Sequence, residues 1–281
     1  MIEAVPSRTA ARVARRRAVH QVLDRPLVFG DPLALRIAGL EESDIRADAP
    51  REQHPFARML RAFLAARSQF AEERVARAVE RGVWQVVILG AGLDTFAYRH
   101  PYGDSIAVFE VDYPPTQAWK RRRLADAGIA IPRSTYHVPV DFERQTAFDA
   151  LAAAGFDAGA PAFFSWLGVT MYLSEATVTS VLRSIASLGR GSGVAFDYAT
   201  DPAKLSEEAR QIIAAMALRV AAAGEPWTLF FDPGRLERSL RDLGFTHVED
   251  LDSNAINARY FDHRVDGLRV GSIGRLLHAE V

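Results

Sequence analysis

The sequence predicts an α/β fold, a mostly parallel seven-stranded sheet with helices on both faces. From about residue 84 onward, short apolar runs alternate with helical patterns, which is typical of strands joined by crossover helices. One apolar run breaks into a glycine turn, as parallel strands do before a ligand site. With 281 residues, 49% hydrophobic and 25% charged, the chain has the composition of a globular enzyme with a sizeable core.

The first 80 residues are helical in pattern, and the sheet begins only after them. We expect N-terminal helices at Arg8 to Leu23, Asp31 to Leu40 and His54 to Arg81. Strands are then expected near 84–90, 105–111, 135–140, 161–166, 192–198, 245–251 and 268–277, with helices near 115–128, 143–154, 175–188 and 233–243.

An Ala-rich helix, Leu205 to Ala223, interrupts this alternation after the fifth strand. Insertions at the carboxyl edge of such sheets commonly cover the ligand crevice. We therefore predict one domain over 1–281, with a helical cap at 1–82, a cofactor-binding half at 83–200, a lid insertion at 201–232 and a C-terminal completion of the sheet at 233–281.

Composition excludes several classes of function. The chain has no cysteine, which removes disulfides, thiolate catalysis and cysteine–zinc sites. Its net charge of −1 provides no global field for nucleic acid, and the basic run 120–123 is interpreted as a solvated helix face. No apolar run approaches the roughly 20 residues of a membrane span. We expect a cytoplasmic monomer or homodimer without a metal, a nucleic-acid partner or a membrane.

The most informative segment runs from Val86 to Thr95. Four apolar residues lead into Gly90-Ala91-Gly92, followed by the capping pair Asp94-Thr95. This pattern predicts a buried strand, a tight turn in which glycine allows close approach to a ligand, and the start of a helix. About 20 residues further on, the run 107–112 ends in acids, which places a carboxylate beside the turn, where a ribose could bind.

The details of the turn favour one cofactor. A dinucleotide fingerprint has a third glycine where this chain has Thr95, and Asp94 would repel a pyrophosphate at the helix start. S-adenosylmethionine carries a sulfonium and an ammonium but no phosphate, so nearby acids suit it. Asp94 could also serve simply as a helix cap. Together these features predict a methyltransferase.

With this motif in view, the chain resembles the leucine carboxyl methyltransferase family, and within it a bacterial branch of S-adenosylmethionine-dependent O-methyltransferases. The resemblance covers nearly the whole chain. Its residues lie in the segments 24–34, 65–68, 85–99, 109–114, 138–142, 164–173 and 196–198. The resemblance implies a class I, Rossmann-like methyltransferase fold.

The resemblance also implies which residues hold the cofactor. Gly90, in the turn with Gly92, would lie against it, and Asp112 would bind the ribose hydroxyls. Asp141 would accept from the adenine amino group, and Phe142 would cover the ring. Arg67 would pair with the cofactor carboxylate, because a guanidinium binds a carboxylate through two hydrogen bonds.

One position departs from the family pattern. In the eukaryotic relatives a glutamate after the fourth strand contacts the cofactor, and here that position is Leu167. The loss of this carboxylate argues against transferring the protein substrate of those relatives to this chain. The neighbouring Trp166, Met171 and Tyr172 would form either an apolar wall around the methyl group or part of the core.

We therefore predict O-methylation of a small-molecule carboxylate or hydroxyl. A carboxylate acceptor needs a cation for docking, and a hydroxyl needs a base such as a histidine. The docking candidates are Arg15, Arg16, Arg17, Arg25 and Arg259, and the base candidates are His20, His137 and His263. The alternatives are a nicotinamide-dependent oxidoreductase and a non-catalytic regulatory protein that binds the cofactor.

Overall fold

A computed structural model describes residues 7–222, 224–272 and 274–281 of the chain. Seven strands form one sheet in the order β3-β2-β1-β4-β5-β7-β6. Only β7 runs against its neighbours β5 and β6, so the predicted mostly parallel, seven-stranded sheet is confirmed. The strands are β1 (Gln85–Leu89), β2 (Ala107–Asp112), β3 (Thr135–Pro139), β4 (Ala162–Trp166), β5 (Gly193–Ala199), β6 (His247–Leu251) and β7 (Gly274–Glu280).

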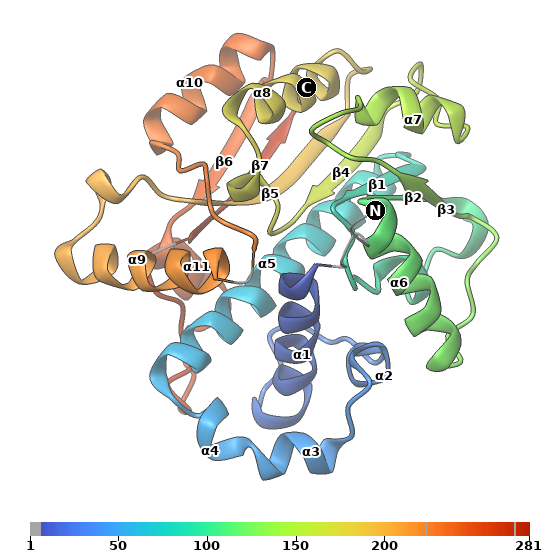
Figure 1. The fold of residues 1–281 in the computed structure, drawn as a ribbon. Coiled ribbons are helices and arrows are strands. Elements are labelled where there is room, and N and C mark those ends of the chain that lie inside the picture. Colours follow the sequence, from blue (N-terminus) through green and yellow to red (C-terminus); the bar gives the residue numbers. More distant parts are fainter. Residues whose placement is uncertain (1–6, 223, 273) are drawn as a thin grey trace.

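Both faces of the sheet are buried, which is why the central strands are mostly apolar. Val87 and Leu89 of β1 join one apolar cluster, and Val86 and Ile88 join the other. The first cluster includes α7 (Ala147–Ala153), α8 (Glu175–Ala186) and α10 (Pro233–Leu243), and the second includes α5 (Pro55–Glu80) and α11 (Ser253–Tyr260). Figure 1 shows the first three helices above the sheet and α5 below it.

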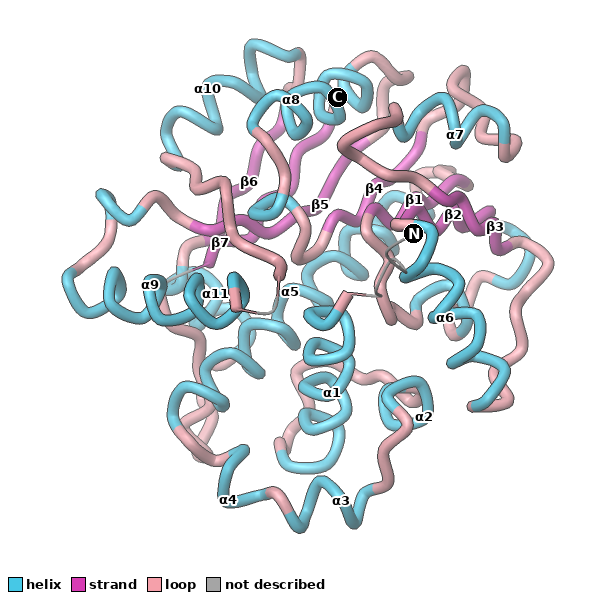
Figure 2. Tube along the Cα trace, in the orientation of Figure 1, coloured by secondary structure: helices cyan, strands magenta, loops and turns pink. Residues whose placement is uncertain are grey.

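The N-terminal helices form a cap that extends from the sheet, at the bottom of Figure 2. They are α1 (Arg8–Leu23), α2 (Ala34–Ala38), α3 (Glu42–Ala47) and α4 (Ala49–Glu52). The predicted bounds of α1 are confirmed, whereas the short and polar α3 and α4 were not predicted. Asp24 ties the cap to α5, because its two oxygens accept hydrogen bonds from Arg61 at 2.7 and 2.9 Å in a buried site.

The inserted helix is α9 (Glu207–Ala221), and it begins with a side-chain cap from Ser206. It lies at the left of Figure 1, beside the first half of α5. Ile213 and Met216 on its inner face pack against Phe56 and Leu60 of α5. The insertion is therefore anchored on the cap side of the molecule. Short 3₁₀ helices lie at η1 (Phe96–Tyr98), η2 (Gly103–Ser105), η3 (Thr170–Tyr172) and η4 (Pro202–Lys204).

Two local predictions were wrong. The last strand begins at Gly274, not near 268, because the backbone of Val270 pairs with the side-chain amide of Asn257 instead of a strand. The glycine turn leads only into η1, a single turn of 3₁₀ helix. The next α-helix is α6 (Pro114–Asp126), after β2.

The basic run on α6 also differs from its prediction as a solvated face. Lys120 is 1% exposed and donates to Glu110 of β2 at 2.6 Å, and the hydroxyl of Tyr98 donates to the same carboxylate at 2.6 Å. Arg123 donates to the backbone of Ile37 in α2. Half of the run is therefore structural. Among the described residues, no helix combines the length and the apolar character that a membrane crossing requires.

Candidate functional site

The carboxyl ends of β1, β2 and β4 border a cavity of about 520 Å³, here called the first cavity. All seven candidate residues of the cofactor site line it, namely Arg67, Gly90, Gly92, Asp112, Asp141, Phe142 and Leu167. Segments that are far apart in the sequence thus meet at one place. What each of these side chains does toward a cofactor stays a prediction.

The glycine turn has the backbone geometry that only glycine adopts easily. Gly90 and Gly92 have φ angles of +67° and +45°. The N–H groups of Gly90 and Ala91 both donate to the carbonyl of Val111, at 2.8 and 3.1 Å, which fixes the turn against β2. A Cβ on Gly90 would overlap a methyl carbon of Val169 on the facing loop. The turn and this loop are therefore in direct contact at the cavity wall.

Asp112 is held in place by the backbone around it. One carboxylate oxygen accepts from the N–H of Gly92 at 2.5 Å, and the other accepts from the N–H of Tyr113 at 2.7 Å. Burial raises the pKa of Asp112, and these two hydrogen bonds oppose that rise. Each oxygen of an ionised carboxylate can accept two hydrogen bonds, so capacity remains for hydroxyl groups of a ligand.

Thr95, at the position of the third fingerprint glycine, has a structural role. Its buried hydroxyl donates to Asp31 at 2.9 Å and accepts from Arg17 at 2.8 Å and from Arg99 at 2.9 Å. Arg17 also pairs directly with Asp31. Asp94 caps the N–H of Phe96 at 2.7 Å and faces the same cavity. Thr95, which replaces the third glycine of a dinucleotide fingerprint, thus joins the N-terminal cap to the glycine turn.

Arg67 lies at the inner end of the first cavity and is 7% exposed. Its Nη1 donates to Asp197 of β5 at 3.0 Å, and the other oxygen of Asp197 accepts from the N–H of Gly168 at 2.5 Å. Gly168 has a φ of +72°, and a Cβ there would lie 2.7 Å from Nη1 of Arg67. Asp197 thus positions Arg67. As the single acid within the apolar strand 193–199, it could have been singled out from the sequence.

Asp141 and Phe142, after β3, and Leu167, after β4, also line the first cavity. One oxygen of Asp141 accepts from the N–H of Glu143 at 3.1 Å, and the other lies 3.6 Å from Arg144. Phe142 is half-buried and packs on the core below it. Leu167 is half-buried and packs on the opposite apolar cluster. It therefore presents an apolar surface at the position where the resemblance implies a carboxylate in the eukaryotic relatives.

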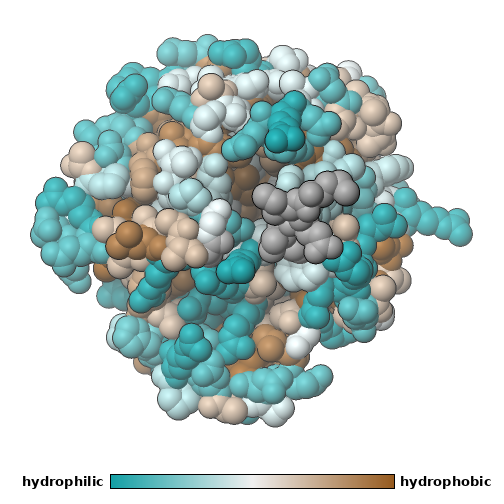
Figure 3. All heavy atoms as spheres, viewed as in Figure 1, coloured by the Kyte–Doolittle hydropathy of each residue, from teal (hydrophilic) through white to brown (hydrophobic). Residues whose placement is uncertain are grey.

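A second cavity, of about 270 Å³, adjoins the first and shares five lining residues with it, Thr9, Val13, Arg67, Gly168 and Tyr172. Its walls come from α1, α5 and α9, together with Met171 and Trp227. Figure 3, viewed as Figure 1, shows apolar side chains in a recess between hydrophilic ones near the centre of the molecule.

The structure separates several alternatives that the sequence left open. Met171 and Tyr172 line the second cavity, whereas Trp166 is fully buried in the core. Among the aromatic residues that follow α9, Trp227 lines this cavity, whereas Phe231 is buried in the core and Phe230 packs in the cluster that joins α9 to α5.

Of the five docking candidates, Arg16 alone lines the second cavity. Arg17 pairs with Asp31 at the first cavity. Arg15 pairs with Asp48, and Arg259 pairs with Glu73 and Glu249. Arg25 donates to backbone carbonyls on the surface.

The segment after α9 is fastened to the start of α1. Glu225 accepts from the N–H of Thr9 at 2.9 Å and also from the hydroxyl of Thr9. Thr9 lines both cavities and Glu225 lines the first. Positions 10, 13, 14 and 17 of α1 also face the first cavity, as the 3.6-residue period of a helix requires. Nothing local in the sequence signals a contact over this separation.

The three histidines considered as bases lie elsewhere. His20 is buried against Asp24, His137 lies beside Glu110, and His263 is on the surface. Among the described residues that line the two cavities there is no histidine.

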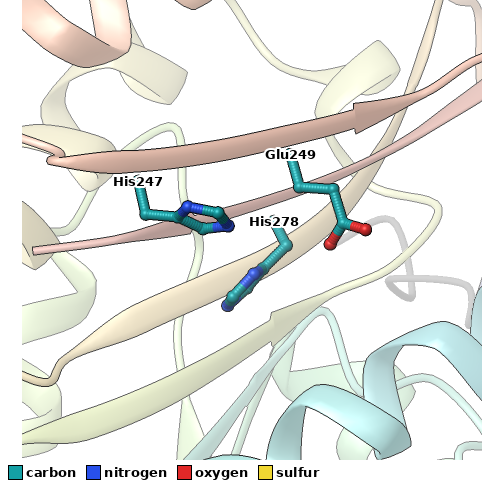
Figure 4. Close-up of side chains that lie close together, drawn as sticks. All are labelled: His247, Glu249 and His278. Atoms are coloured by element: carbon teal, nitrogen blue, oxygen red, sulfur yellow. The ribbon is translucent and has the colours of Figure 1, made fainter.

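A possible metal cluster lies on the antiparallel strands β6 and β7. Ligand atoms of His247, Glu249 and His278 lie within 4.8 Å of one another. Figure 4 shows the three side chains close together on the paired strands. The sequence did not reveal it, because His278 faces Glu249 only through strand pairing. Burial and the nearby Arg74 lower the pKa of His278 to about 3, so the ring is neutral. However, Glu249 already pairs with Arg74 and with Arg259, whose charges oppose a bound cation.

We expect Gly90→Ala to weaken binding of S-adenosylhomocysteine by about tenfold or more, because the left-handed backbone costs about 1–2 kcal/mol with a Cβ. In addition, the new methyl would displace Val169. Calorimetric titration measures the affinity. Gly82→Ala is the control, since Gly82 has a φ of +92° with no atom near its Cβ position. Equal affinity in the two variants would contradict this prediction.

Comparison with known proteins supports the class of enzyme that the sequence predicts. The sequence profile of the family "Leucine carboxyl methyltransferase" matches residues 10–186. YktD of Bacillus subtilis strain 168, named as an S-adenosyl-L-methionine-dependent methyltransferase, is 32% identical over 94% of this chain and 94% of its own length. A protein of the same description from Mycolicibacterium paratuberculosis strain K-10 is 34% identical over 69% of this chain, which spans 62% of that relative. A crystal structure described as a methyltransferase from Thermobifida fusca YX has a TM-score of 0.57 at 20% identity, covering 99% of this chain and 96% of its own.

Proposed function

The chain belongs to the leucine carboxyl methyltransferase family of S-adenosylmethionine-dependent enzymes, and on this premise we propose that it methylates an oxygen atom of a small molecule held in the second cavity. The observation that carries the proposal is the junction of the two cavities at Arg67, Gly168 and Tyr172. A donor in one cavity and an acceptor in the other would meet there.

The first cavity fits S-adenosylmethionine in size and in chemistry. About 520 Å³ lies within the usual range of small-molecule sites, roughly 300–1,000 Å³. Asp112 retains acceptor capacity for ribose hydroxyls, and Asp141 lies on the neighbouring loop for the adenine. Arg67 has further N–H groups for the cofactor carboxylate beyond the one given to Asp197. When bound, the cofactor supplies an electrophilic methyl group on a sulfonium.

The chain's own residues align the acceptor and exclude water, which are the main requirements of an in-line methyl transfer. The apolar walls of the second cavity orient the body of the acceptor toward Arg67 and Tyr172. Burial raises the pKa of Tyr172, so its hydroxyl stays protonated and can donate a hydrogen bond.

An acceptor oxygen that is already ionised suits this site better than an alcohol. An alcohol needs a base within hydrogen-bond reach. Among the described residues of the second cavity the one acid is Asp197, and Arg67 and Gly168 already occupy it. A carboxylate is ionised at neutral pH and needs no base. We therefore favour a carboxylate over a hydroxyl.

Transfer of a tritiated methyl group to a panel of carboxylic acids, phenols, amines and thiols tests the proposal. Label in a product that releases volatile methanol in mild base identifies a methyl ester, whereas an alkali-stable ether identifies a hydroxyl acceptor. Transfer to amines or thiols without any oxygen acceptor would overturn O-methylation. Titration with S-adenosylhomocysteine, run in parallel, checks that the protein tested is competent to bind.

We expect Val220→Trp to lower kcat/KM for any acceptor found by about tenfold or more, because the indole fills the second cavity. Val220 lines this cavity only, so the affinity for S-adenosylhomocysteine should stay within about twofold of the parent. Leu218→Trp is the matched control, since Leu218 lies on the same helix but is 73% exposed. If both variants kept full activity, the second cavity would not be the acceptor site.

A further inference from the structure

The second cavity combines an apolar interior with a cationic rim. Half-buried or buried side chains of Phe56, Leu60, Leu64, Met171 and Met216 line its interior. At about 270 Å³, it is about half the size of the first cavity, which favours a compact acceptor. An apolar acceptor body would bury itself here and displace water at a favourable free energy.

The charges around this interior are nearly all of one sign. Four arginines line the cavity, Arg12 and Arg16 from α1, Arg67 from α5 and Arg219 from α9. Arg67 is offset by Asp197, and Arg16 is offset by Glu52 at 3.1 Å. Within the part of the chain that the structure describes, Arg12 and Arg219 have no carboxylate partner. A positive potential therefore faces the solvent at this opening.

The arginines of the second cavity differ in how deeply they are buried. Arg67, at the junction with the first cavity, is 7% exposed, whereas Arg12 and Arg219 are exposed. Arg219 also lies over the ring of Phe56, with its guanidinium carbon 5.2 Å from the ring centre, which holds it above the apolar interior. The two exposed arginines come from the cap helix and from the lid helix and face one opening.

Resting on the proposed function, we propose that the acceptor is a compact amphipathic anion, a monocarboxylate with an apolar body, which Arg12 and Arg219 attract and select. The apolar walls hold the body of the acceptor, and the arginine charges discriminate against a neutral analogue of the same shape. This discrimination weakens as salt rises, because exposed charges are screened within about 10 Å at 0.1 M ionic strength.

Calorimetric titration of the protein saturated with S-adenosylhomocysteine tests the inference with two probes, octanoate and its neutral isostere octanamide. We expect octanoate to bind about tenfold more tightly at low salt, with the difference reduced at 0.5 M NaCl. In the double variant Arg12→Gln/Arg219→Gln, the preference for octanoate over octanamide should fall several-fold and should lose its dependence on salt, because only the buried Arg67 then remains to favour the anion. The affinity for octanamide should not change.

Arg8→Gln/Arg210→Gln is the matched control, because it removes the same charges from the same two helices. Neither residue lines the cavity. Equal binding of octanoate and octanamide, or equal losses in the two double variants, would overturn the inference. Failure of S-adenosylhomocysteine to bind in the first step would instead count against the proposed function, so the two failures are distinguishable.

Discussion

Replacing Asp112 with alanine is expected to weaken binding of S-adenosylhomocysteine by about 100-fold. A hydrogen bond to a charged group contributes about 1.5–3 kcal/mol, and two ribose hydroxyls would lose their acceptor. The substitution also frees the N–H groups of Gly92 and Tyr113, which Asp112 now holds. The glycine turn would thus lose its tie to the end of β2 together with its ligand contact.

Isothermal titration calorimetry measures this loss directly. Asp126→Ala on α6 removes the same charge from an exposed position and serves as the control. Circular dichroism of the Asp112 variant verifies that the sheet has formed. An unchanged dissociation constant in a folded Asp112→Ala protein would rule out the proposed ribose contact.

The largest expected effect on stability comes from Lys120→Met. This change leaves Glu110 buried without its cation, and breaking a buried ion pair costs about 3–5 kcal/mol. Burial raises the pKa of Glu110, and the Lys120 ammonium opposes that rise. In the variant the carboxyl is therefore protonated more readily, so its penalty should shrink as the pH falls toward 5 and grow toward pH 8.

Urea unfolding of the parent and the variant at both pH values measures the two effects. Arg122→Gln, an exposed neighbour on the same helix, should change the free energy of unfolding by less than about 0.5 kcal/mol. Glu110→Gln/Lys120→Met should recover a large part of the loss, because no charge then remains buried at the pair. A Lys120→Met protein as stable as the parent would show that the pair contributes little.

Much of the fold could be predicted because its signals are local. The central strand β1 is buried on both faces, and its residues 86–89 therefore form a continuous apolar run. The helix α1 carries a serine cap where the prediction began it. The last strand was misplaced because Val270 is buried like a strand residue but pairs with a side chain. Burial alone does not distinguish a residue whose backbone pairs with a neighbouring strand from one whose backbone pairs with a side chain.

The candidate site was predicted as far as its residues lie in short motifs. The turn at 90–92 and the strand-end acids Asp112 and Asp141 line one cavity, as parallel strand ends should. The partner of Arg67 was missed because Asp197 lies 130 positions away. The link between Thr9 and Glu225 was missed for the same reason. Such pairs depend on tertiary packing, which no periodicity reports.

The helices α1, α5 and α9 line the two cavities to different extents, which determines how substitutions on each helix affect binding. The first half of α5 and the inner face of α9 border the second cavity alone, whereas α1 borders both cavities. Under the proposed function, substitutions on the inner face of α9 therefore change the acceptor that binds while the cofactor site is preserved. Substitutions at Thr9 or Val13 of α1 alter both cavities at once, because these residues line both.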